Sequence, residues 1–123
     1  SASIGSIGVY CAILDTSGMY AAKGGRVEMF KSGPLKGMGH PGTTLTTEQR
    51  DLLQASVDTL AAEFKATVRA GRARDIADET MQGQSFSAIG AMANGLIDSI
   101  TTFEQAVADA SRLASIRRGS GTK

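Results

Sequence analysis

Residues 45–71 have the sequence LTTEQRDLLQASVDTLAAEFKATVRAG, which is the clearest helical pattern in the chain. Its apolar side chains recur at steps of three and four residues, which places them on one face of an α-helix. They are Leu53, Val57, Leu60, Ala61, Phe64 and Val68. Thr46 and Gln49 have the spacing of a capping box, and Gly71 predicts the end of the helix. We therefore expect one long amphipathic helix with a single apolar face.

The residues before this helix predict two strands joined by a short helix. Residues 6–14, SIGVYCAIL, form an apolar run of strand length, which favours a strand covered on both faces. Residues 15–23 favour a brief helix closed by glycine, and residues 26–30, RVEMF, alternate as a second strand does. Strand, helix and strand in this order normally give a parallel pair through a right-handed crossover.

Residues 31–45 are expected to form a long loop, because they contain four glycines and both prolines. Downstream we predict a short helix near Ile76, a helix over residues 87–94, a short strand at 96–98 and a helix over 101–116. Alternating strands and helices give the α/β class. Residues 1–116 are expected to form one portion of a domain, followed by a flexible basic tail over 117–123.

Composition excludes several classes of function. Thirteen basic and twelve acidic residues give a net charge of +1, which argues against a nucleic-acid partner. No apolar run approaches the roughly 20 residues that span a bilayer. The single cysteine, Cys11, lies in an apolar run and is expected in the core. The redox compartment stays undecided.

Four groups of side chains are candidates for chemistry. His40 lies in a flexible loop and is expected to be exposed rather than catalytic. Asp75, Asp78 and Glu79 have helical spacing but no histidine partner, which favours a solvated acidic face and no metal site. Lys36 follows a predicted strand in KSGPLKG, although a solvated loop lysine is the commoner case. The residue types alone leave the function open.

Five segments point to a specific function, because they occur in an order found in one protein family. They are GSIGV at 5–9, KSGPLKG at 31–37, LTTEQRDLLQASVD at 45–58, AGR at 70–72 and GLIDSI at 95–100. Together they resemble the signal peptide peptidase A family of serine–lysine peptidases, which includes phage prohead proteases. The resemblance implies the C-terminal part of a wound α/β fold similar to Clp protease and crotonase.

The resemblance also implies a mechanism and its residues. Lys36 corresponds to the general base, and Ser6 corresponds to the serine that orients the lysine amine. The nucleophile of the family precedes the GSIGV segment, so we expect this chain to be a fragment that is inactive alone. A lysine with an ordinary pKa near 10.4 cannot accept a serine proton, and burial is the usual means of lowering it. Backbone N–H groups are expected to form the oxyanion hole.

The expected substrate is a peptide in extended form, with no cofactor and no metal. A homo-oligomer is expected, and membrane association only through segments outside this chain; a bacterial cytoplasmic or membrane-associated location is plausible. Two alternatives remain open. The chain could be a noncatalytic oligomerisation module of the same fold, with its amphipathic helices covering those of other subunits. It could also be an acyl-CoA-binding relative of crotonase, against which the KSGxxK pattern argues.

Overall fold

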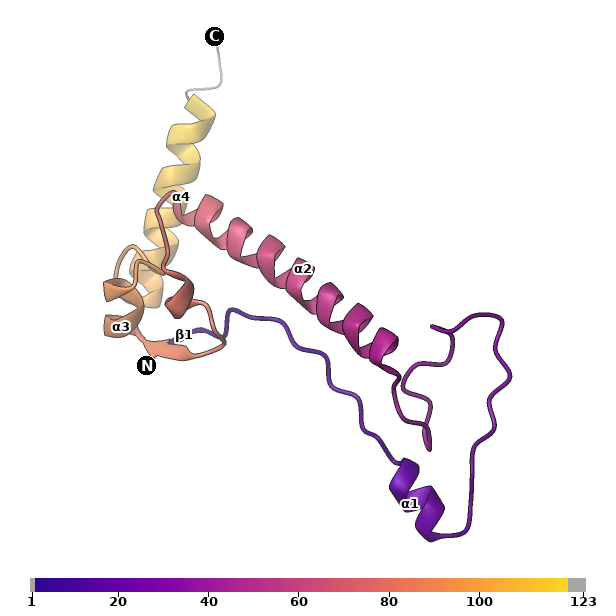
Figure 1. Cartoon of the computed structure of the whole chain (residues 1–123). Helices are drawn as coiled ribbons and strands as arrows, with labels where there is room; N and C mark the ends of the chain where they lie inside the picture. The colour runs from indigo at the N-terminus through magenta and orange to yellow at the C-terminus, as the bar shows by residue number, and fades with distance from the viewer. Residues whose placement is uncertain (1, 120–123) are drawn as a thin grey trace.

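The computed structural model describes residues 2–119 and has an open shape built along one long helix. At one end of this helix lies a small lobe, and at the other lie a short helix and a long loop (Figure 1). The elements are β1 (Ser3–Gly5), α1 (Ser17–Ala22), α2 (Thr47–Arg72), η1 (Asp78–Thr80), β2 (Ser85–Ser87), α3 (Ala88–Ala93) and α4 (Phe103–Gly119). Helices together with a small sheet agree with the α/β class.

Helix α2 confirms the predicted helix, although Leu60 and Phe64 on its apolar face are 53% and 40% exposed. Thr46 is the N-cap, and its side chain and that of Gln49 form the expected capping box. The predicted end at Gly71 is wrong by one residue, because α2 continues to Arg72. Ala73 then takes the left-handed conformation that usually falls to glycine, with a φ of 49°. A helix of 26 residues is about 39 Å long, so its two ends serve different parts of the molecule.

The core lies beside the C-terminal end of α2. Its five buried hydrophobic residues come from segments far apart in the sequence, and Val68 of α2 packs against them. They are Ile7, Ile76, Met81, Ala91 and Leu96. Burial of apolar surface is the main stabilising term in folding, so this lobe joins the N-terminal residues to the segments that follow α2.

The sheet differs from the predicted one. It has two strands, β1 and β2, which pair antiparallel with Ile4 opposite Phe86. The strands predicted over residues 6–14, 26–30 and 96–98 are wrong, and so is the parallel pair. Residues 8–14, which we call the arm, are extended but are not part of a ladder. A strand needs a partner for its N–H and C=O groups, and no segment within residues 2–119 pairs with the arm.

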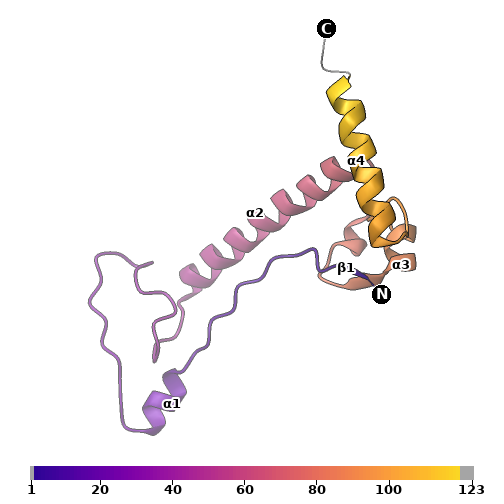
Figure 2. The same cartoon turned by 180° about the vertical axis from the view of Figure 1, so that it is seen from behind.

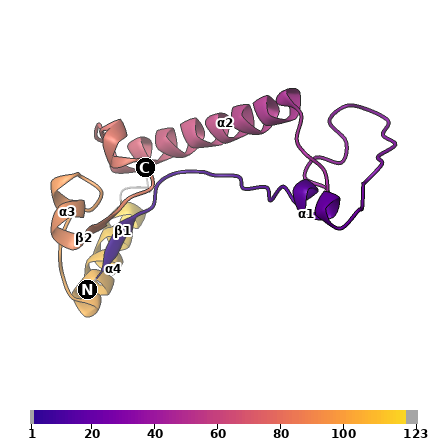
Figure 3. The ribbon, with the colours of Figure 1, turned by 60° about the horizontal axis from the view of Figure 1, so that its bottom comes forward.

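The arm runs alongside α2 from the small lobe to α1 (Figures 1, 2 and 3). Cys11 and Ile13 line a groove with Leu53 and Val57 of α2, which fits the period of two of an extended chain. The side chains on the other face of the arm are exposed, so the prediction that both faces of this segment are buried is wrong. Tyr10 is 88% exposed, and Leu14 and Phe30 are exposed similarly. Cys11 is also exposed, which corrects its assignment to the core.

The remaining helices largely follow the predictions. Helices α1 and α3 lie inside the ranges expected for them, and α4 starts at Phe103 and continues past 116. In place of the helix expected near Ile76, the chain forms the single turn η1. The predicted tail begins within α4, and its last residues, 120–123, lie outside the described residues. No helix among those described is long and apolar enough to cross a membrane.

Gly5 gives a direct test of the small lobe. Its φ is +142°, and a Cβ there would lie 2.4 Å from the Gln84 carbonyl oxygen. We expect Gly5→Ala to lower the free energy of unfolding by about 1–3 kcal/mol, because backbone atoms must shift. Urea unfolding followed by circular dichroism measures this change.

Gly8→Ala is the matched control for Gly5→Ala. Its added Cβ would meet the Gly83 nitrogen at 3.6 Å, an ordinary contact. This variant should stay within about 0.5 kcal/mol of the parent chain. Equal stability of the two variants would contradict the proposed close approach of β1 to Gln84.

Candidate functional site

The loop that carries Lys36 lies at the N-terminal end of α2. As predicted, residues 31–46 contain no helix or strand, only turns and bends. Two glycines let the loop pack closely on residues 27–29. A Cβ on Gly37 would lie 2.6 Å from Met29 Sδ, and one on Gly42 would lie 2.7 Å from Val27 Cγ2. Both glycines have φ near +80°, so the loop has a specific conformation at these points.

A second set of contacts holds the loop to the start of α1. The Thr16 hydroxyl accepts a hydrogen bond from the Gly42 N–H at 2.7 Å. The Ser17 and Thr44 hydroxyls are 3.0 Å apart, and Ser17 also donates to the Asp15 carboxylate at 2.6 Å. Hydrogen bonds from Ser17, and a smaller contribution from Thr44, hold the pKa of Asp15 below its ordinary value. The loop is therefore attached to the start of α1 as well as to residues 27–29.

Lys36 itself is exposed to solvent. Its N–H donates to the Gly33 carbonyl at 3.1 Å, which closes a tight turn. With Gly33, Pro34 and Leu35 it lines a shallow, mainly apolar hollow. The described residues therefore do not desolvate its amine. His40 in the same loop is exposed as predicted, and its Nδ1 lies 2.9 Å from the Pro41 carbonyl oxygen.

Ser6 lies at the other end of the arm. Its N–H donates to the Gln84 carbonyl at 2.8 Å, and its φ of 55° is uncommon for a residue with a side chain. The neighbouring Ile7 belongs to the core beside Val68, whereas the lysine loop lies beside Gln49. Val68 lies nineteen positions after Gln49 in α2, which corresponds to roughly 28 Å along the helix axis. The structure therefore does not bring Ser6 and Lys36 together within residues 2–119.

Two of the recognised segments meet in space through one arginine. Arg72, at the end of AGR, donates from Nε to the Gly95 carbonyl at 3.0 Å and from Nη2 to the Asp98 carboxylate. Arg74 reaches the same carboxylate at 3.4 Å. A guanidinium forms such forked contacts because its donors are fixed in one plane. The sequence showed both segments but gave no sign that they pair.

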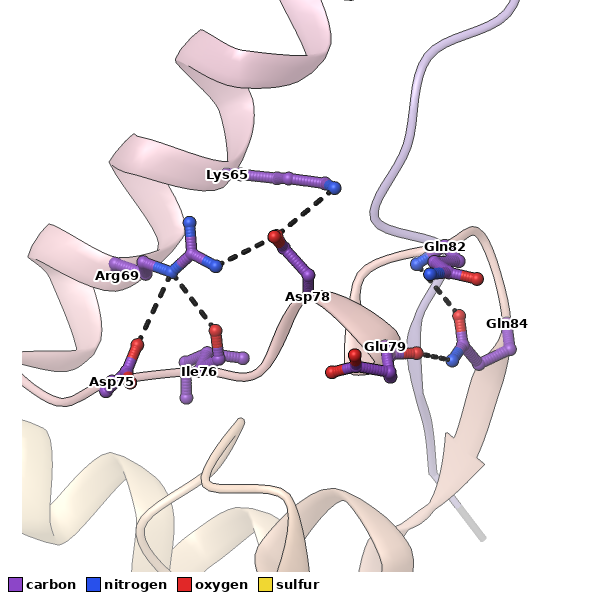
Figure 4. Close-up of polar contacts among 8 residues, drawn as sticks. All are labelled: Lys65, Arg69, Asp75, Ile76, Asp78, Glu79, Gln82 and Gln84. Carbon is purple, nitrogen blue, oxygen red and sulfur yellow. Dashed lines mark hydrogen bonds and ion pairs between the residues drawn. The ribbon is translucent and has the colours of Figure 1, made fainter.

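Two of the three acidic residues in 75–79, Asp75 and Asp78, form ion pairs with α2. Lys65 and Arg69 both point toward Asp78 (Figure 4), at 3.3 and 2.9 Å. Asp75 lies 3.7 Å from Arg69, whose Nε also donates to the Ile76 carbonyl. Hydrogen bonds from Arg69 and then Lys65 lower the pKa of Asp78. Within residues 2–119 no cluster of three or more ligating side chains could hold a metal ion.

Comparison with known proteins identifies the family. The sequence pattern of peptidase family S49 matches residues 1–117. This chain belongs to peptidase family S49. It is also 32% identical over 114 residues to a protein of Synechocystis sp. (strain ATCC 27184 / PCC 6803 / Kazusa) that is named "Putative protease slr0021". That match covers 91% of the chain but 41% of the relative, so the chain spans less than half of that protein's length.

Membership in S49 supports the signal peptide peptidase A resemblance that was drawn from the five segments. In this S49 chain the segments serve different purposes. GSIGV, AGR and GLIDSI contribute to the small lobe and its arginine contacts, whereas KSGPLKG stands apart at the far end of α2. Packing among the described residues therefore explains the KSGPLKG pattern less well than it explains the other segments.

Ser17→Ala tests the attachment of the loop to α1. The change removes one donor to the Asp15 carboxylate, so the pKa of Asp15 should rise toward its ordinary value. Carbon-13 NMR titration of the carboxyl group measures the shift. Because folding lowers this pKa, the contact stabilises the fold above about pH 4, and the contribution is lost as pH falls through the lowered value.

Ser56→Ala is the control, since the Ser56 hydroxyl donates to the Leu52 carbonyl within α2. It should leave the titration of Asp15 unchanged. A Ser17→Ala variant in which Asp15 titrates as before would show that the Ser17 hydroxyl does not bind the carboxylate.

Proposed function

We propose that this S49 chain is the lysine-bearing part of a serine endopeptidase that uses a serine–lysine dyad. Lys36 is the general base, and the fold of the complete domain resembles that of Clp protease and crotonase. The observation that carries the proposal is the KSGPLKG loop in a chain of this family. Its closest described partners hold the backbone on both sides of Lys36 but leave the amine free.

The chemistry sets two requirements for the base. A lysine accepts a proton at neutral pH only when its surroundings disfavour the ammonium form, which requires removal from water. It must also lie within hydrogen-bond reach of the nucleophile. The described residues do not remove the Lys36 side chain from water, because it is exposed. We propose that other polypeptide covers the loop and supplies the serine, so that the site forms at a contact between two pieces of protein.

The hollow beside Lys36 favours this arrangement. Gly33, Pro34 and Leu35 line it, and its exposed surface is mostly apolar. A covering segment would exclude water there and strengthen electrostatic interactions inside the site. The base would take the serine proton during attack and return it to the leaving amine. Family resemblance assigns Ser6 the role of orienting the amine, and this role would require Ser6 to approach Lys36 from a neighbouring copy or after rearrangement.

The proposed substrate is a peptide in extended form, and the proposed type is a signal peptide peptidase or a phage prohead protease. The relative from Synechocystis is named as a protease, which agrees with this class of reaction. No cofactor or metal takes part in the proposed step.

The test is peptide hydrolysis by the complete gene product that contains this sequence. Lys36→Ala should lower kcat by about 10²–10⁴-fold, the usual contribution of a general base. Lys23→Ala removes another exposed lysine, just after α1, and should retain full activity. Undiminished hydrolysis by Lys36→Ala would remove the proposed base.

A second proposed role is assembly with further copies of the same chain. Its accessible surface is 9254 Å², whereas a compact monomer of this mass has roughly 6,200 Å². The excess exceeds the roughly 1,600 Å² that a standard interface buries in total. Large apolar side chains are exposed on the arm, including Tyr10 and Leu14, and on the segment after α1, where Phe30 is 94% exposed. A second copy placed there would cover them and pair the free backbone of the arm.

Light scattering during size-exclusion chromatography tests the assembly role. We expect a mass above that of the monomer for the parent chain, and a monomer for the double variant Tyr10→Glu with Phe30→Glu. Ile89→Glu is the control, because Ile89 is 77% exposed on α3, away from the arm. A folded parent chain that stays monomeric at high concentration would argue against self-assembly.

A further inference from the structure

Gln49 is a buried polar residue whose side-chain amide uses both its oxygen and its nitrogen in hydrogen bonds. Its exposed fraction is 4%, and it lies in the first turn of α2. Oε1 accepts a hydrogen bond from the Thr46 N–H at 3.1 Å, which completes the capping box. Nε2 donates to the Pro34 carbonyl at 2.7 Å. One side chain therefore joins the start of the helix to a loop residue 15 positions earlier.

Pro34 is part of the turn that presents Lys36. The turn is closed by the Lys36 N–H, which donates to the Gly33 carbonyl. On the side of Pro34 the backbone is held by Gln49, and on the other side Gly37 packs on Met29. The backbone of Lys36 is thus fixed from two directions, although its side chain is exposed.

The two contacts of Gln49 require different chemistry. A capping box accepts either glutamate or glutamine at this position, because only an acceptor is needed. The contact with Pro34 needs a donor, which an ionised glutamate lacks. Glutamate would also bring a carboxylate oxygen against a carbonyl oxygen. The amide therefore provides something beyond capping, because without its donor the Pro34 carbonyl keeps only the longer contact with Lys31 Nζ at 3.4 Å.

We propose that Gln49 is a positioning residue for Lys36, which holds the lysine turn on the rigid first turn of α2. The inference rests on the proposed function, in which Lys36 is the base. A base must be presented with an accuracy of about 0.5 Å, and groups on helices are placed more precisely than groups on loops. The Gln49 contact gives a loop residue the positional precision of a helix.

The first experiment measures hydrogen exchange of the Lys36 amide in the full chain carrying Gln49→Glu. We expect exchange to become at least about tenfold faster, which corresponds to about 1.4 kcal/mol of lost protection. The Leu53 amide inside α2 should keep its protection, because glutamate preserves the capping box. Lys36 exchange at the parent rate would overturn the proposal. If Gln49→Glu does not fold, Gln49→Met replaces it, since Met keeps the volume and lacks the donor.

The second experiment measures hydrolysis and its pH profile in the complete gene product. We expect Gln49→Glu to lower kcat by on the order of 10- to 100-fold with KM nearly unchanged, as for a misplaced catalytic group. We also expect the pH profile of kcat to shift, which a purely structural loss of folded protein would not produce. Unchanged kcat and profile would overturn the proposal.

Gln105→Glu is the matched control for both experiments. Gln105 occupies the same position in α4, where its N–H donates to the Thr102 hydroxyl, and its side chain contacts Asp109 rather than a loop. It should leave Lys36 exchange and hydrolysis unchanged. An equal effect of Gln105→Glu would overturn the positioning role. Full activity of Lys36→Ala would instead refute the base, while the exchange result would still report whether Gln49 holds the turn.

Discussion

The packing of Ile7 against Ile76, Met81, Ala91 and Leu96 is the interaction on which the rest of the structure depends. It brings the N-terminal residues to segments that follow α2, and so closes the chain on itself. The antiparallel pair of β1 with β2 lies within this lobe. Because burial is concentrated there, the far end of α2 must be organised by hydrogen bonds and close glycine contacts instead.

Those polar contacts give the lysine loop a defined form without a core of its own. Gln49 holds Pro34, Thr16 holds Gly42, and the Ser17 hydroxyl lies beside that of Thr44. Each hydrogen bond adds only about 1 kcal/mol, so the loop relies on several of them together. Such a loop can keep its backbone fixed while its lysine amine stays free to meet another surface. This combination suits a catalytic residue whose site is completed by a second piece of protein.

The structure also exposes much apolar surface away from the lysine loop. One face of the arm lies toward α2, and its other face is exposed. Helix α4 exposes Phe103, Val107 and Leu113. Within residues 2–119 the apolar run that was predicted to be a buried strand, and the apolar side chains of α4, therefore lie largely on the surface. The peptidase proposal places other protein on the lysine loop, and the assembly proposal places it on the arm. They differ in whether that protein supplies a nucleophile.

The sequence by itself determined α2 with its capping box, the short helices α1 and α3, the long glycine-rich loop and the S49 family. These features depend on local spacing and local hydrogen bonds, which can be recognised without knowing distant contacts. The tertiary structure was needed to show that the arm has no strand partner within residues 2–119, that Arg72 joins Asp98 and that Gln49 holds Pro34. It also decided that Ser6 and Lys36 lie at opposite ends of α2. A strand pairing or a side-chain contact depends on which segments meet in space, and residue spacing carries no record of that.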